Sequence, residues 1–381
     1  FTKLSSWRFV TMIDVTVLCG FLGSGKTTTV KHLIENCPEG VKIGVIANDV
    51  AKINIDASLI QETVKNEGGN VSSMQLDNGC ACCTNSGDLI KAFEELTNGA
   101  AFDHVVIEAS GVGEAKQLRT VVEEFPRVKS GDAKLARVVT LVDSNDFLNH
   151  YRTGETLQER PDLTGETEEA SRRLLVDLMV EQIESSDVVL LNKMDLLQDR
   201  LHEAQLLASI VQKLNPSAPL HEVSFGMIDL LSLEEGGRPT EHSCSKCTGG
   251  CCSKSHKQRY GIDSFVFQSN TPFHGPSLAK NVLQKMAAVQ QNANLDIFDG
   301  LDDEEKGECE QENPFRNVIR SKGFLWLASQ SSKKMYWSHA GKHFSVMPQG
   351  GWDEKIPAQQ QLVFIGINMN KEQITNLLET C

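Results

Sequence analysis

The stretch "GFLGSGKT" at residues 20–27 has the spacing G-x-x-x-x-G-K-[ST] of a phosphate-binding loop, here called the P-loop. It follows the apolar run "VTVLC" and opens a segment with helical periodicity near residues 27–36, the strand-to-helix context that such a loop requires. Glycines let backbone N–H groups turn toward phosphates, and the start of the helix adds its dipole. The alternative is a chance glycine-rich turn, which the strand, the helix and the Lys-Thr pair together disfavour. The stretch therefore predicts a nucleotide site.

Each position of the P-loop has an expected task. Lys26 supplies a positive charge for the β- and γ-phosphates, and the Thr27 hydroxyl is a ligand for Mg²⁺. The predicted nucleotide-binding positions are Gly20, Gly23, Ser24, Gly25, Lys26, Thr27 and Thr28.

The acidic partner of this loop is expected at the end of a neighbouring strand. "DHVVIEASG" places Glu108 directly after an apolar run. A carboxylate there can hold Mg²⁺ directly or through water, whereas the alternative is a surface acid just past a strand. With the P-loop present we favour the metal-side role, and we predict Lys26, Thr27 and Glu108 as the catalytic set.

A third motif indicates which base is bound. "LLNKMD" follows the apolar run "DVVLL" and supplies Asn192, Lys193 and Asp195 in the N-K-x-D spacing of guanine-reading proteins. The Asp carboxylate can accept hydrogen bonds from the guanine N1–H and exocyclic amine, and adenine lacks this donor pair. Alone the tetrad could be a helix cap. After a P-loop and an acidic strand end, it predicts GTP rather than ATP.

The surrounding pattern predicts the fold class. Strand-like runs alternate with helical patterns near residues 27–36, 86–97, 114–123 and 200–214. The runs are "VTVLCG", "VKIGVIA", "HVVIEAS", "ARVVTLVD" and "DVVLLN". This alternation predicts an α/β P-loop GTPase domain over residues 12–230, with a doubly wound, mostly parallel sheet.

Composition changes after about residue 231, which predicts a Cys-rich linker or insertion over residues 231–261. From residue 262 to 381 the pattern predicts a small α+β domain with helices near 276–291 and 371–380. Its predicted strands are "SFVFQS", "NVIRSKGFLWLAS", "KKMYWS" and "QLVFIGI". The acidic run "DGLDDEEKGECEQE" is expected to be a solvated loop.

Three cysteines lie within four positions in "GCACC", as Cys80, Cys82 and Cys83. A disulfide between neighbouring cysteines is strained, and a C-x-C redox pair is a further alternative. Thiolates suit Zn²⁺ and Co²⁺, and residues two apart in an extended segment point the same way. Cys80 and Cys82 can therefore face one ion, and Cys83 can join them if the chain bends. We favour metal binding.

The P-loop, "IEASG", "NKMD" and above all "GCACC" resemble the CobW-like GTPases, a family of metallochaperones and metal-insertion proteins. "RSKGFLWLAS" and "QQQLVFIG" are similar to that family's C-terminal domain, so the resemblance covers most of the chain. The C-x-C-C signature is that of its CobW and zinc-transfer branches. The resemblance implies a GTPase whose cysteines carry a transferable metal for a client metalloprotein, and we expect that metal to be Zn²⁺.

The family's N-E-F-G-E segment corresponds to "ANDVAKINID" here, and Lys52 stands where the common pattern has glutamate. The resemblance therefore implies Asp49 as a switch residue or an extra metal ligand and puts the second acid in doubt. The predicted metal-site residues are Cys80, Cys82, Cys83, Thr27, Glu108 and Asp49.

Other metal-ligating side chains gather in "HSCSKCTGGCCSKSH". These six cysteines and histidines form either a four-ligand zinc site or a solvated loop that binds metal loosely, and both readings stay open. His339 and His343 are expected to be satisfied domain histidines rather than ligands.

The bulk composition limits the class of partner. A formal net charge of −14 disfavours non-specific binding to nucleic acid and to anionic membranes, and no apolar run is long enough to span a bilayer. Eleven cysteines in clusters favour reduced thiols in a cytoplasmic protein. Because the sequence begins at Phe1, an organelle-targeting segment could precede it. A homodimer is compatible with this reading.

The sequence thus predicts a GTP-hydrolysing metallochaperone with Mg²⁺ at the nucleotide and Zn²⁺ at the cysteines. Two rivals remain. One is a cobalt chaperone for cobalamin synthesis, since thiolates do not separate Co²⁺ from Zn²⁺. The other is a non-enzymatic zinc buffer in which the nucleotide is only structural.

Overall fold

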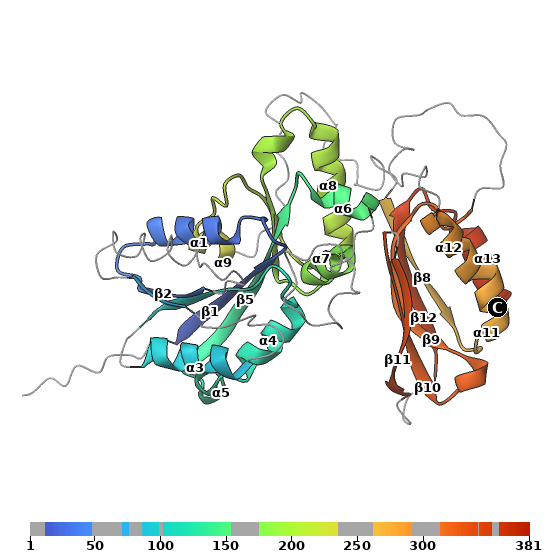
Figure 1. The fold of residues 1–381 in the computed structure, drawn as a ribbon, viewed down its shortest axis with the longest axis horizontal. Helices are drawn as coiled ribbons and strands as arrows, with labels where there is room; N and C mark the ends of the chain where they lie inside the picture. Colours follow the sequence, from blue (N-terminus) through green and yellow to red (C-terminus); the bar gives the residue numbers. More distant parts are fainter. Residues whose placement is uncertain are drawn as a thin grey trace, which may run out of the picture.

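The computed structural model describes residues 12–47, 71–75, 86–98, 102–153, 175–234, 262–291, 313–341, 343–352 and 358–381. These residues build two β-sheets, each accompanied by helices (Figure 1). Within the described ranges no helix is long and apolar enough to cross a membrane.

The first sheet has seven strands in the order β3-β2-β4-β1-β5-β6-β7, and every neighbouring pair is parallel. The predicted doubly wound sheet is confirmed. Its strands are β1 (Ile13–Gly20), β2 (Ile43–Ala47), β3 (Val71–Gln75), β4 (His104–Glu108), β5 (Ala133–Asp143), β6 (Val188–Asn192) and β7 (Leu220–Glu222). Its helices are α1 (Lys26–Glu35), α3 (Ser86–Thr97), α4 (Ala115–Glu123), α5 (Pro126–Ser130), α6 (Phe147–Thr153), α7 (Leu175–Glu184), η3 (Met194–Leu197), α8 (Leu201–Leu214) and α9 (Leu230–Glu234).

Helices cover both faces of this sheet because its central strands are apolar on both faces. Val30, Leu33 and Ile34 of α1 pack with α9 against one face, in a cluster that includes Leu18 and Leu190. On the opposite face α3 and α4 pack over β1, β2 and β4, and α7 and α8 pack over β5 and β6. Continuous burial of β2, β4 and β6 is the pattern expected of a covered parallel sheet.

Strand order places three polar strand ends and the first glycine of the P-loop side by side. The neighbouring strands β4, β1, β5 and β6 end at Glu108, Gly20, Asp143 and Asn192. The strand order also reverses at β1, because β1 is followed by β2 on one side and later by β5 on the other. Ligands of open parallel sheets bind beyond the carboxyl ends of the strands at such a reversal.

The second sheet is antiparallel, in the order β11-β10-β9-β12-β8. Its strands are β8 (Ile262–Ser269), β9 (Val318–Trp326), β10 (Lys333–Ala340), β11 (His343–Gly351) and β12 (Gln360–Ile367). Its helices are α11 (Gly275–Leu278), the π-helical turn η4 (Ala279–Leu283), α12 (Gln284–Gln291), η6 (Ala328–Gln330) and α13 (Lys371–Glu379). Trp337, Phe364 and Leu378 belong to the core between this sheet and its helices.

The two sheets are joined through an apolar cluster. Figure 1 shows α6 and α7 on the side of the seven-stranded sheet that faces the antiparallel sheet. Residues of α7 and α8 share one buried cluster with Ile262, Ile319, Ala340, Ile365 and Ile367 of the second sheet. The predicted boundaries at residues 230 and 261 lie close to where the described chain stops after Glu234 and resumes at Ile262, and they stay a prediction.

A buried histidine makes the stability of this fold dependent on pH. His104 begins β4 with 4% of its surface exposed, and its Nε2 lies 2.9 Å from Thr16 Oγ1. Burial lowers the pKa of His104 to about 4; Asp14 opposes this shift and Arg137 adds to it. The unfolded chain therefore binds a proton near pH 6.5 that the folded chain accepts only near pH 4.

We expect His104 to cost the fold about 2 kcal/mol of unfolding free energy when the pH falls from about 7.5 to about 5. Urea unfolding at both pH values measures this loss. In His104→Gln the unfolding free energy should fall less between these pH values, because the contribution of His104 is gone. In the control His202→Gln, a change at an exposed histidine, it should fall as much as in the parent chain. An identical pH dependence in the parent chain and in His104→Gln would contradict the assignment.

Candidate nucleotide site

The P-loop joins β1 to α1 and is shaped by its glycines. Gly25 has φ +101° and precedes the first residue of α1, and a Cβ at this position would collide with Asn192 Nδ2. No side chain caps the start of α1, and its first turn holds no acidic residue. The first N–H groups of the helix therefore remain suited to a phosphate.

Lys26 is held within this loop. Its Nζ donates to the backbone oxygens of Gly20 at 2.9 Å and Phe21 at 3.0 Å, and 7% of the residue is exposed. Among the other predicted positions, Ser24 is buried, whereas Gly23 and Thr28 are exposed. The loop thus brings the ammonium group and the helix start to one place.

Thr27 and Glu108 meet although 81 residues separate them in the chain. Thr27 Oγ1 donates to Glu108 Oε1 at 2.6 Å, and Glu108 is 4% exposed at the end of β4. A hydroxyl and a carboxylate oxygen are hard oxygen donors of the kind that Mg²⁺ prefers. This pair therefore fits the predicted magnesium ion of the nucleotide.

The predicted base-reading residues lie beside the P-loop but differ in their contacts. Asn192 Nδ2 donates to Ser24 O at 2.8 Å, and its Oδ1 accepts from the Gly226 N–H at 2.9 Å. Asn192 is 2% exposed, so it serves the site by tying the P-loop to the loop after β7. Lys193 has φ +65°, and its Nζ forms an ion pair with Asp143 at 2.6 Å.

Asp195 carries the most informative polar atom of the site. Its backbone N–H donates to Ser224 Oγ at 3.1 Å, while its carboxylate Oδ1 is closed to solvent and has no hydrogen-bond partner among the described residues. A buried acceptor without a partner is costly, unless a ligand supplies the donor. The guanine N1–H and exocyclic amine are such donors.

Three contributors were not predicted from the sequence. Asp143 ends β5 as Glu108 ends β4, so the rule that found Glu108 would also have found Asp143. Ser224 and Gly226 lie in the loop after β7, a strand of three residues, and their only sequence signal is the Ser-x-Gly turn. Both contact the N-K-x-D segment through hydrogen bonds.

The predicted transferable-metal residues Cys80, Cys82, Cys83 and Asp49 lie outside the described residues, as does the cluster at residues 242–256. Elsewhere in the described chain, no three His, Cys, Asp or Glu side chains come together as a metal site. Cys19 is fully buried beneath the P-loop, and burial raises the pKa of its thiol to about 12, which Lys26 and Arg119 partly oppose. Cys19 therefore stays a neutral core residue. His339 is buried in β10, consistent with a domain histidine.

The structure nevertheless fixes the ends of the segment that carries the cysteines. β3 ends at Gln75 and α3 begins at Ser86. Because the sheet is parallel, β3 ends at the same edge as β1, and three strand spacings amount to about 14 Å. The C-x-C-C segment thus leaves and rejoins the described chain beside the nucleotide edge.

Comparison with known proteins gives matches over both sheets. The family description "CobW/HypB/UreG, nucleotide-binding domain" matches residues 14–222, and "Cobalamin synthesis protein cobW C-terminal domain" matches residues 262–381. The chain is 30% identical over 414 aligned positions to zinc-regulated GTPase metalloprotein activator 1 of Dictyostelium discoideum, covering 97% of this chain and 79% of that protein.

Two further matches concern one bacterial protein. The zinc chaperone YjiA of Escherichia coli is 25% identical, with 95% of this chain and 96% of YjiA covered. The crystal structure of Zn(II)-bound YjiA GTPase from E. coli is matched with a TM-score of 0.40 and 18% identity, covering 97% of this chain and 98% of that chain.

Proposed function

We propose, from the premise that this chain belongs to the CobW/HypB/UreG family of nucleotide-binding proteins, that it hydrolyses GTP to GDP and phosphate and thereby hands Zn²⁺ to a client protein. The observation that carries the proposal is the edge at which the P-loop, Glu108 and Asp195 meet and from which both flanks of the C-x-C-C segment leave. Two relatives support it, since the Dictyostelium protein is named a zinc-regulated GTPase metalloprotein activator and YjiA of E. coli a zinc chaperone.

The described residues divide the work on GTP. Lys26 would exchange its two backbone acceptors for phosphate oxygens, and the N–H groups at the start of α1 would add hydrogen bonds. Thr27 and Glu108 would hold Mg²⁺, which neutralises charge on the phosphates when bound. Asp195 would accept from guanine, while Asn192 keeps the base-side loop against the P-loop. Each group thus stabilises charge or position rather than forming a covalent bond.

For the cargo we propose Cys80, Cys82 and Cys83 as Zn²⁺ ligands, with Asp49 as a further oxygen ligand or switch residue. Two or three thiolates leave a position open in a tetrahedral site, through which a client ligand can enter. β2 ends at Ala47 on the same sheet edge, and Asp49 comes two residues later in the sequence. A nucleotide-dependent rearrangement of the segments that carry Asp49 and the three cysteines would then change the affinity for Zn²⁺.

The proposal also concerns the oligomeric state of the protein, its client and its cellular compartment. Thiolate ligands require a reducing environment such as the cytoplasm. A homodimer is compatible with the fold, and the client is a metalloprotein that accepts the ion. The division into a nucleotide domain at residues 12–230, a linker at 231–261 and a C-terminal domain at 262–381 remains our proposal.

Changing Cys80, Cys82 and Cys83 together to serine tests the metal assignment. We expect Zn²⁺ affinity with Mg-GTP bound to fall by more than about a hundredfold, because ligand loss exceeds the effect of removing an outer-shell partner. Competition with a chromophoric chelator measures it, and titration with Co²⁺ compares the two metals. Cys37→Ser, a half-buried thiol outside the motif, is the matched control. Unaltered stoichiometry and affinity of Zn²⁺ binding in the triple variant would contradict the assignment.

A further inference from the structure

Helix α7 contacts the loop that follows Glu108. Gln182 on α7 is 1% exposed, and its Nε2 donates to Gly113 O at 2.8 Å and to Gly111 O at 3.4 Å. The backbone oxygen of Gln182 in turn accepts from Thr140 Oγ1 on β5 at 2.9 Å. One side chain therefore holds the loop of residues 109–113, here called the post-Glu108 loop, against α7.

The post-Glu108 loop also touches the P-loop. A Cβ at Gly111 would lie 2.8 Å from the backbone nitrogen of Leu22 and 3.1 Å from Leu22 Cβ. The loop begins directly after Glu108, whose carboxylate accepts from Thr27. A shift of this loop would therefore move both the metal-side carboxylate and the phosphate-binding backbone.

Two hydrogen bonds from Gln182 hold this junction in addition to the close approach of Gly111 to Leu22. A cavity of about 70 Å³ lies between P-loop and α7, lined among others by Phe21, Leu22, His150 and Gln182. Close-packed interiors resist displacement, whereas a void leaves its lining without partner atoms on one side. The two bonds from Gln182 thus add a directional constraint on the post-Glu108 loop to its packing against Leu22.

The antiparallel sheet contacts the same helix through ion pairs. Arg320 on β9 is 5% exposed, and its Nε lies 3.3 Å from Glu184 Oε1 on α7. Lys322 Nζ approaches the same oxygen at 2.9 Å, and Arg320 also donates to His339 O at 3.1 Å. Burial acts to lower the pKa of Arg320, but Glu184, followed by Tyr151 and Asp177, outweighs it and leaves that pKa raised. Arg320 is a charged anchor of the second sheet on α7.

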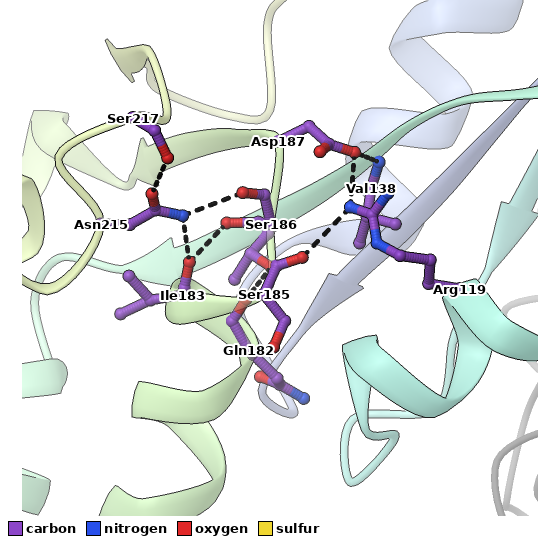
Figure 2. Close-up of polar contacts among 10 residues, drawn as sticks. Arg119, Val138, Gln182, Ile183, Ser185, Ser186, Asp187, Asn215 and Ser217 are labelled. Atoms are coloured by element: carbon purple, nitrogen blue, oxygen red, sulfur yellow. Dashed lines mark hydrogen bonds and ion pairs between the residues drawn. The ribbon is translucent and has the colours of Figure 1, made fainter. Parts of the chain in front are cut away.

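Further hydrogen bonds hold the end of α7, between the contact of Gln182 with the post-Glu108 loop and the contact of Glu184 with the antiparallel sheet. Figure 2 shows Asn215 donating to the backbone oxygens of Ile183 and Ser186, at 2.8 and 2.9 Å. Arg119 reaches the same turn through Ser185 O and Asp187. The Gln182 side chain points away from this network in the figure. Gln182, Ile183 and Glu184 thus contact three different units from one helical turn.

We propose that Gln182 is a positioning residue for GTP hydrolysis and that the C-terminal sheet tunes hydrolysis through Arg320, Glu184 and α7. The inference rests on the proposed GTPase function. It assigns a role to the C-terminal sheet that does not require the sheet to touch GTP.

Kinetics of the full chain test the first part. Gln182→Met keeps the length of the side chain and removes both donors. We expect kcat for GTP to fall by about ten- to a hundredfold while KM and GDP affinity change less than about twofold, because the loop is misplaced but the binding groups remain. Arg119→Met, which disturbs the turn in Figure 2 without touching Gln182 or Glu184, should keep kcat within about twofold.

A double-mutant cycle tests the second part. Arg320→Met should change kcat by about fivefold in the parent chain and much less in the Gln182→Met background. If Gln182→Met does not fold, as judged by thermal unfolding, Glu184→Gln replaces it in the cycle with Arg320→Met, and the two changes are expected to alter kcat non-additively without changing KM.

The outcomes separate the two levels of the proposal. A parent chain without GTP hydrolysis overturns the proposed function and this inference with it. An active parent with unchanged kcat in a folded Gln182→Met variant overturns the inference alone. So does an equal loss of kcat in Arg119→Met, or strict additivity of Gln182→Met and Arg320→Met, because either result would reduce Gln182 to a general stabiliser of the helix.

Discussion

Asp195→Asn is expected to weaken GTP binding by about a thousandfold and to create preference for xanthosine triphosphate. In the parent chain Asp195 Oδ1 is closed to solvent and has no hydrogen-bond partner among the described residues, and guanine would supply the donor. The asparagine amide would place a donor against the donors of guanine. Xanthine has a carbonyl oxygen in place of the exocyclic amine, and this oxygen can accept a hydrogen bond from the amide. A buried mismatch of this kind costs more than the lost hydrogen bond itself.

Isothermal titration with both nucleotides measures this exchange. Asp199→Asn is the matched control. Asp199 is exposed and lies a few residues further along the chain, and its substitution removes the same charge. GTP affinity should stay near the parent value in Asp199→Asn. Equal affinity of Asp195→Asn and the parent chain for GTP would mean that the segment does not read the base.

Lys26→Met is expected to reduce kcat for GTP hydrolysis by about a hundred- to a thousandfold, the usual cost of removing one well-placed charge or donor from a transition state. The ammonium group of Lys26 already lies inside the loop, on Gly20 O and Phe21 O, so it is positioned before the nucleotide arrives. Methionine keeps the apolar stem and removes only the charge.

Single-turnover phosphate release separates the chemical step from binding. Lys31→Met on the same helix removes an equal charge outside the loop, and it should leave the rate within about twofold of the parent. Thermal unfolding of both variants checks that the loop still folds without the two hydrogen bonds from Lys26. A Lys26→Met rate equal to that of Lys31→Met would exclude a phosphate role for Lys26.

Much of the first sheet could be predicted because its segments carry their own signals. The helix expected at residues 86–97 coincides with α3, and the P-loop, Glu108 and Asn192 all end buried strands as predicted. Each of these signals is local: an apolar run of defined length followed by a polar residue. Parallel strands then bring the polar ends together without further information from the sequence.

Three strands that sequence analysis did not identify lack such signals. β3 reads "VSSMQ" and β7 has only three residues, so neither forms an apolar run. β11 reads "HFSVMPQGG", with a proline and two glycines that disfavour a strand. Among the described strands it pairs with β10 alone, at the sheet edge, where proline is tolerated. Neighbouring strands, rather than local propensity, decide these segments.

The same distinction applies within the site. Asp143 follows the strand-end rule and could have been found, whereas Gln182 gives no local sign of its role. It lies in the apolar helix "LVDLMVEQIE" and contacts glycines about 70 residues earlier in the chain. Such a contact depends on how α7 packs over the sheet, and one sequence does not reveal that packing.

The apolar cluster shared by α7, α8 and the antiparallel sheet has a consequence for how the chain gains and loses its structure. Ile262, Ile319 and Ile365 are covered by helices that belong to the other sheet. Separating the two halves would expose apolar surface on both, so neither half has its full stability alone. The halves should therefore melt as one cooperative unit, and a truncated product ending between them would be prone to aggregation and degradation.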